Sequence, residues 1–92
     1  MIHAKRPLPN QWASLDDNFD SVSLQTKQKF PQIVSVDHYN WQQGYMMGFW
    51  VRKNTTAQQR KQIHDYAMPL WVQIRRWDGM GSTSSQCQVN VY

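Results

Sequence analysis

The sequence has 92 residues, of which 40% are hydrophobic and 13% aromatic, and ten Lys and Arg against six Asp and Glu give a net charge of +4. So many large apolar residues exclude a disordered chain, and a chain this short buries only about 60–65% of its unfolded surface, which excludes two independent cores. The single Cys87 excludes an internal disulfide and a thiolate metal site.

Residues 1–13 are predicted to form an extended arm. Pro7 and Pro9 fix the backbone and disfavour both a helix and a central strand, and Trp12 is the candidate anchor of the arm. No apolar run follows the basic residues of the arm. We therefore expect neither a signal peptide nor a membrane-spanning helix, and a location in the cytoplasm.

A first helix is predicted over residues 15–29. Leu15 and Val22 belong to an apolar series at helical spacing, with acidic residues early and lysines late, as the helix dipole favours. Ser14 is the expected N-cap, and Pro31 supplies a stop just beyond the last turn.

A β-hairpin is predicted next, with strands at 32–41 and 45–53. Both stretches are rich in β-branched and aromatic residues, and Gly44 lies in the interruption between them. A helix through Gly44 and Gly48 is the alternative, but two glycines would cost it about 2 kcal/mol relative to alanine.

A second helix is predicted over residues 56–68, followed by a second hairpin. Thr56 and Gln59 form a capping box, and Pro69 is expected to end the helix. Alternation at 70–77 and 85–92 predicts the two strands of the second hairpin, joined by the turn-rich residues 78–82. The helix packs through Ile63, Tyr66 and Ala67.

The expected fold is a single α+β domain in which one mostly antiparallel sheet packs on helices. Successive strand residues point to opposite faces, so the parity of the sequence sorts the side chains. Phe49, Val72, Ile74 and Val89 fall on the core face and are predicted to be nearly inaccessible. The opposite face is predicted to carry Met46, Trp50, Arg52, Trp71, Gln73, Arg75, Trp77, Gln88, Asn90 and Tyr92.

Aromatic residues interleaved with arginines and amides are typical of platforms for single-stranded nucleic acids, and the same residue types dominate protein-binding hot spots. The alternative is that the first helix covers this face and the tryptophans are core. Basic residues also cluster near the second helix, where a solvated helix face with a Lys61–Asp65 pair is the alternative to a binding surface. The candidate binding residues are Arg52, Arg60, Lys61, Trp50, Trp71, Arg75 and Trp77.

Catalysis has less support in the sequence. The histidines are too scattered for a metal site, and no phosphate loop or nucleophile motif is present, so we predict no metal or cofactor. One enzyme remains an alternative, a small metal-independent ribonuclease with His38 and His64 as acid and base and Arg52 or Arg75 on the phosphate. Cys87 is expected to be inert packing.

In size and style, as a lone basic α+β domain without a catalytic signature, the chain looks like the small phage-encoded proteins that block host machinery, anti-CRISPR proteins among them. This likeness covers no particular residues, and it implies a non-enzymatic binding protein. The leading hypothesis is a protein that docks on nucleic acid or a nucleoprotein complex such as a CRISPR effector. The alternative is a purely protein-directed inhibitor or adaptor, with a homodimer as one form.

Overall fold

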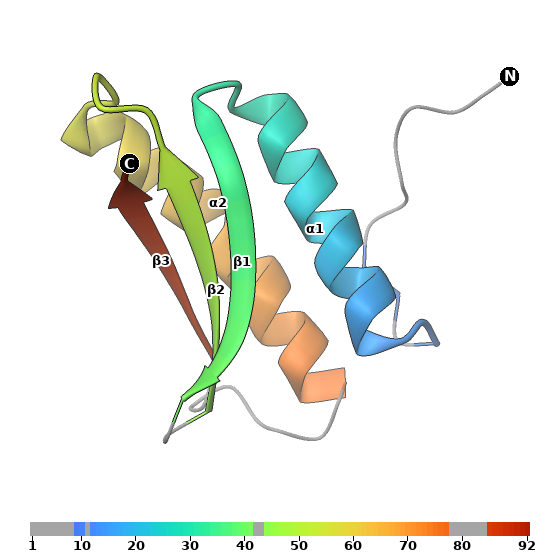
Figure 1. The fold of residues 1–92 in the computed structure, drawn as a ribbon. Helices are drawn as coiled ribbons and strands as arrows, with labels where there is room; N and C mark the ends of the chain where they lie inside the picture. Colours follow the sequence, from blue (N-terminus) through green and yellow to red (C-terminus); the bar gives the residue numbers. More distant parts are fainter. Residues whose placement is uncertain (1–8, 11, 42–43, 78–84) are drawn as a thin grey trace, which may run out of the picture.

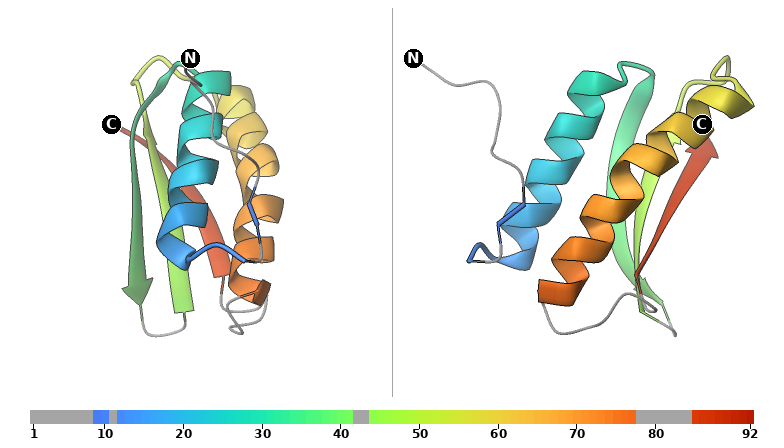
Figure 2. Two further views of the ribbon diagram at one scale, coloured as in Figure 1. Left: turned by 90° about the vertical axis from the view of Figure 1, so that its right-hand side faces the viewer. Right: turned by 180° about the vertical axis from the view of Figure 1, so that it is seen from behind.

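The structure is a computed structural model, and it describes residues 9–10, 12–41, 44–77 and 85–92. The described elements form two layers, with a three-stranded sheet in one and two helices packed on one face of it in the other (Figure 1 and Figure 2). The predicted α+β class is therefore confirmed. In chain order the elements are α1 (Leu15–Lys29), β1 (Ile33–Trp41), β2 (Gly44–Val51), α2 (Ala57–Trp77) and β3 (Ser85–Val91).

The first helix, α1, has the predicted bounds and caps. Ser14 is the N-cap, and its Oγ accepts a hydrogen bond from the Asp17 N–H at 3.1 Å. The Phe30 N–H donates to the Thr26 carbonyl at the other end. Acidic residues lie in the first turn and lysines in the last, so the two kinds of charge are separated by about 15–20 Å along the helix axis.

The arm joins α1 through an asparagine pair rather than through its tryptophan. The Asn10 N–H donates to Asn18 Oδ1 at 2.8 Å, and Asn18 Nδ2 donates to the Asn10 carbonyl at 2.9 Å. Asn18 is buried, whereas Trp12 is 85% exposed. The prediction that Trp12 anchors the arm is wrong, because the buried amide satisfies both backbone groups of Asn10. The rest of the predicted arm, residues 1–8 and residue 11, lies outside the described part of the chain.

The predicted first hairpin is confirmed. Strands β1 and β2 pair antiparallel, with Val36 opposite Phe49 and His38 opposite Met47. The register shifts between Ile33 and Ser35, where one extra residue of β1 is accommodated.

The predicted strand at 70–77 is wrong, because α2 continues through Pro69 to Trp77. Proline lacks an N–H and its ring disfavours the helix interior, at a cost of about 3 kcal/mol. Four large or close-packing residues at helical spacing are completely or almost completely buried, and at about 1.5–3 kcal/mol for each large apolar side chain their burial outweighs that cost. They are Ile63, Ala67, Trp71 and Ile74.

The start of α2 is as predicted, since Thr56 and Gln59 form the capping box. The Thr56 N–H donates to Gln59 Oε1 at 3.0 Å, and the Gln59 N–H donates to Thr56 Oγ1 at 3.1 Å.

The length of α2 also changes the sheet. A helix of 21 residues covers about 31 Å, so it returns the chain to the end of the sheet from which β2 starts. Strand β3 therefore runs parallel to β2, with Val89 opposite Phe49, and the sheet is mixed, in the order β1-β2-β3. The second hairpin and the mostly antiparallel sheet are not formed, while the predicted turn at 78–82 lies outside the described residues.

The core lies between the sheet and the helices. Phe49 and Ile74 are inaccessible, as predicted, but Val72 and Val89 are only half-buried. Val72 differs because it belongs to α2, where alternation does not decide burial. The buried hydrophobic residues are Val22, Ile33, Met47, Phe49, Val51, Ile63, Ala67, Trp71, Ile74 and Cys87.

Candidate functional site

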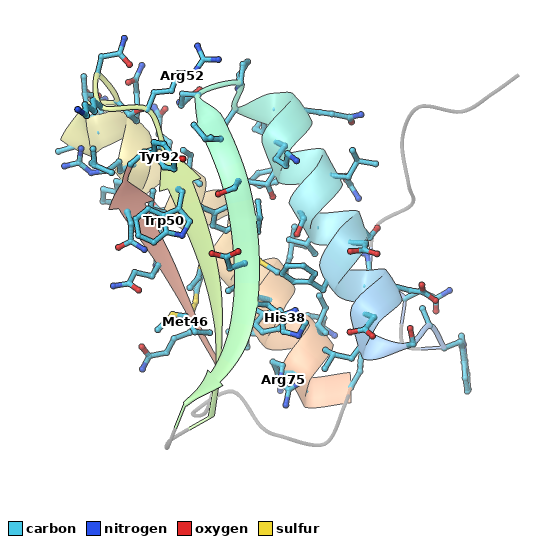
Figure 3. The ribbon with its side chains drawn as sticks, in the orientation of Figure 1. His38, Met46, Trp50, Arg52, Arg75 and Tyr92 are labelled. Carbon is cyan, nitrogen blue, oxygen red and sulfur yellow. The ribbon has the colours of Figure 1, made fainter. Side chains whose placement is uncertain are left out.

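One face of the sheet is left uncovered by the helices. Met47, Phe49 and Val51 of β2 are buried under α1 and α2, so Met46 and Trp50 point the other way. Figure 3 shows Met46, Trp50 and Tyr92 along this open face, with Arg52 beyond them at one end. We call this side of the sheet the open face. Its described members are Ser35, Asp37, Met46, Gly48, Trp50, Gln86, Gln88, Asn90 and Tyr92.

Trp50 is held in a fixed orientation on the open face. Its Nε1–H donates a hydrogen bond to Asp37 Oδ2 at 3.0 Å, across the β1–β2 ladder. The ring of Tyr92 lies nearly perpendicular to the indole, with 6.5 Å between centroids and 82° between planes. Tyr92 is in turn placed by its own N–H, which donates to the Val51 carbonyl at 2.7 Å. Ser35, Asp37, Trp50 and Tyr92 together line a shallow hollow of about 430 Å³.

Trp71 and Arg75, which parity assigned to this face, are buried in the helix layer. Both are 0% exposed, because they belong to α2 rather than to a strand. Trp71 packs edge-on against Phe19 and His38, with centroids 6.3 and 5.9 Å away, and the Arg75 guanidinium carbon lies 5.8 Å from the Trp71 ring. Trp77 is half-buried at the last position of α2. Gln73, also predicted for this face, belongs to α2. The aromatic and arginine residues that remain on the predicted platform are Trp50, Arg52 and Tyr92, beside Met46, Gln88 and Asn90.

The end of α1, the end of β2 and the start of α2 lie at the same end of the molecule (Figure 1), and six basic residues belong to these segments. The Arg52 N–H donates to the Gln32 carbonyl at 3.0 Å, which joins the end of β2 to the turn after α1. Lys29 Nζ lies 5.4 Å from the centre of the Tyr66 ring, which joins α1 to α2. We call this group the basic end, and its members are Lys27, Lys29, Arg52, Lys53, Arg60 and Lys61.

Five of these six side chains are exposed, and the sixth, Arg60, is half-buried and donates from Nη1 to the Thr55 carbonyl at 2.8 Å. Lys61 pairs with Asp65, at 2.7 Å between Nζ and Oδ2, as the alternative of a solvated helix face predicts. The hydrogen bond from Lys61 lowers the pKa of the Asp65 carboxyl. Because both side chains are more than half exposed, this pair contributes little to stability, and Lys61 can exchange it for another anion.

The acidic residues of α1 lie at the far end of that helix. Asp16 and Asp17 are in its first turn, about 15–20 Å from the lysines of its last turn. The sequence order of α1 predicts this separation, but not that its lysines join Arg52 and Lys53. That junction depends on tertiary structure, so sequence reasoning left Lys27 and Lys29 out of the candidate site.

The two histidines of the alternative ribonuclease lie in different surroundings. His38 is half-buried on the helix side of β1, with its ring centroid 4.3 Å from that of Phe19. His64 is partly exposed on α2 beside Asp65, two helical turns and about 10 Å before Trp71, the residue that His38 contacts. Asp37 points to the opposite face from His38, as expected for neighbours in a strand.

Metal and thiol chemistry find no support in the described residues. No group of three or more His, Cys, Asp or Glu among them could hold a metal ion. Cys87 is buried beneath the helices, and burial raises the pKa of its thiol to about 12, which disfavours the reactive thiolate.

No protein-family model, curated protein or solved structure matches this chain. Within the described part of the chain, neither helix combines the length and apolar character needed to cross a membrane.

Proposed function

We propose that the protein is a non-enzymatic nucleic-acid-binding protein that docks on a phosphate backbone through the basic end. The observation that supports this proposal most is that six Lys and Arg residues lie at the end of α1, in the β2–α2 connection and at the start of α2, segments that share one end of the molecule. Exposed cations contribute to binding by contacting phosphates and releasing condensed counterions. A nucleoprotein complex with accessible nucleic acid is a target of the same kind. The inhibitor role implied by the likeness to anti-CRISPR proteins stays a prediction.

The aromatic pair beside the basic end supports the same proposal. Trp50 and Tyr92 lie on the open face next to the strand end that carries Arg52 (Figure 3). Stacking rings beside cationic side chains are the combination that binds single strands with little sequence preference. Trp71 and Arg75 have no part in this smaller surface, because both are buried.

A protein partner is the competing reading of the same surface. Tyr92 is 68% exposed and Trp50 is half-buried, and aromatic residues of this kind also anchor protein interfaces. The two readings differ in salt dependence, because a protein contact through the open face would not release counterions from a nucleic acid.

Salt-titrated binding of labelled single-stranded and duplex oligonucleotides tests the proposal. If all six basic side chains meet phosphates, log K should fall with log salt with a slope no steeper than about −5. Lys53→Ala should weaken binding to every sequence and reduce the slope by about 0.7–0.9, because one phosphate contact is lost. Arg76→Ala is the matched control, since it removes the same charge from an exposed position in the last turn of α2.

Two results would contradict the proposal. One is binding that is absent or independent of salt. The other is an equal loss for Lys53→Ala and Arg76→Ala, which would reflect net charge rather than the basic end. A partner captured from lysate equally well after nuclease treatment, together with salt-independent binding, would favour the protein-directed alternative.

A further inference from the structure

We propose that the hollow lined by Ser35, Asp37, Trp50 and Tyr92 binds one unpaired nucleobase that carries an exocyclic amino group. The inference rests on the proposed function, because this base would belong to the strand whose phosphates meet the basic end. It goes further by naming a single-stranded ligand and a residue that reads the base.

The walls of the hollow suit a planar aromatic ligand. The rings of Trp50 and Tyr92 stand at 82° to each other, so a base that stacks on one ring presents an edge to the other. Trp50 is fixed by the bond to Asp37, so less rotational freedom is lost when a base stacks on it. The volume of about 430 Å³ is within the range of about 300–1,000 Å³ that is usual for small-ligand sites.

Asp37 gives the site its chemical preference. The residue is exposed, and among the described residues the 3.0 Å bond from Trp50 uses one of its roughly four lone-pair positions. A carboxylate accepts hydrogen bonds and donates none, so it pairs with the N4 amino group of cytosine and repels the O4 carbonyl of uracil at the same position.

The charges around the hollow determine how a bound nucleic-acid strand is oriented. Among the described side chains of the open face, Asp37 is the only charged one, while Arg52 of the basic end lies beyond Trp50 and Tyr92 (Figure 3). Phosphates are therefore repelled from the hollow and attracted to Arg52. A nucleotide avoids the repulsion from Asp37 and gains the attraction to Arg52 when its base enters the hollow and its phosphates lie along the basic end.

The test is the affinity for short oligomers of cytidine and of uridine, which differ at the position that Asp37 would read. Wild-type protein should bind the cytidine oligomer about 5-fold more tightly, and it should bind either more tightly than a duplex of equal length. Asp37→Asn retains an oxygen for the Trp50 N–H but also donates, so the preference for cytidine should disappear.

Tyr92→Ala tests stacking separately. This substitution should weaken single-strand binding about 5- to 150-fold, with an unchanged salt slope and little effect on duplex binding. Trp12→Ala is the matched control, because it removes an aromatic side chain that is 85% exposed and belongs to the arm rather than to the open face.

Equal affinity for the two oligomers, or a Tyr92→Ala protein that binds like Trp12→Ala, would overturn the base site. If Lys53→Ala still lowers the salt slope in that case, phosphate docking survives and the base site alone fails. If the wild-type protein binds none of the oligonucleotides, the proposed function and the base site fail together.

Discussion

The two faces of the sheet are made by the same strands but have opposite environments. On the helix side, Met47 and Phe49 are completely buried, whereas on the open face their neighbour Trp50 is only half-buried and hydrogen-bonded to an exposed carboxylate. The difference shows that aromatic content does not decide the role of a residue. What decides it is whether a helix covers the face on which the side chain falls.

Trp50 and Trp71 illustrate the contrast. Trp71 makes its ring contacts with α1 and β1 inside the helix layer, while Trp50 contacts a residue at the end of β3 on the open face. Stability should therefore depend on Trp71, and binding on Trp50. Substitutions that separate the two quantities can break or sharpen this comparison.

The largest effect is expected for Trp71→Ala. Removing a completely buried tryptophan leaves a cavity and should lower the free energy of unfolding by about 3–5 kcal/mol. In so small a protein this is a large share of a total stability of about 5–15 kcal/mol. Urea denaturation followed by circular dichroism measures the loss.

A graded control accompanies this substitution. The Trp71 indole N–H has no hydrogen-bond acceptor among the described residues, so Trp71→Phe removes volume without breaking a hydrogen bond and should cost less than Trp71→Ala. A loss below about 1 kcal/mol for Trp71→Ala would show that the helix layer does not seal this side chain.

Local sequence signals predicted the parts of this fold that depend on neighbours in the chain. The α1 helix, the β1–β2 hairpin, the capping box at Thr56 and the Lys61–Asp65 pair all follow from residues a few positions apart. The strand at 70–77 failed because Leu70, Trp71 and Val72 are consecutive apolar residues that fit either period.

Because Pro69 was expected to end the helix, these residues were interpreted as a strand. The helical stripe that overrides Pro69 starts at Ile63 and continues to Ile74, so the signal was present on both sides of the proline. Of the candidate site, Trp50, Arg52, Arg60 and Lys61 remain, because they lie in elements that were predicted correctly. Strand parity also placed Tyr92 on the open face. The addition of Lys27 and Lys29 required the packing of α1 against the rest, which no local pattern encodes.

A smaller effect on stability, the pH dependence caused by Cys87, tests whether water reaches the helix side of the sheet. Burial raises the pKa of Cys87 from 9.0 to about 12, so the native protein keeps the proton that the unfolded chain loses above pH 9. The stabilisation this provides is complete below pH 9 and is lost as the pH rises toward 12. Between about pH 8 and 10, the wild-type protein should lose about 1.4 kcal/mol more than Cys87→Ala.

Urea denaturation of both proteins at each pH isolates the cysteine, because every other residue is the same in the two chains. Parallel losses of stability would mean that the thiol ionises equally well in the native state, and that water reaches this part of the helix-side face.

The smallest effect on stability is expected for Tyr92→Ala. The Tyr92 side chain is 68% exposed and makes an edge contact with Trp50, while the hydrogen bond to Val51 comes from its backbone and survives the substitution. Exposed side chains that take no part in a buried network usually contribute less than about 0.5 kcal/mol. The melting temperature should therefore stay within a few degrees of wild type while single-strand affinity falls. A clear drop in melting temperature would instead mean that Tyr92 holds the end of β3 against β2, and the open face would then contribute to stability as the covered face does.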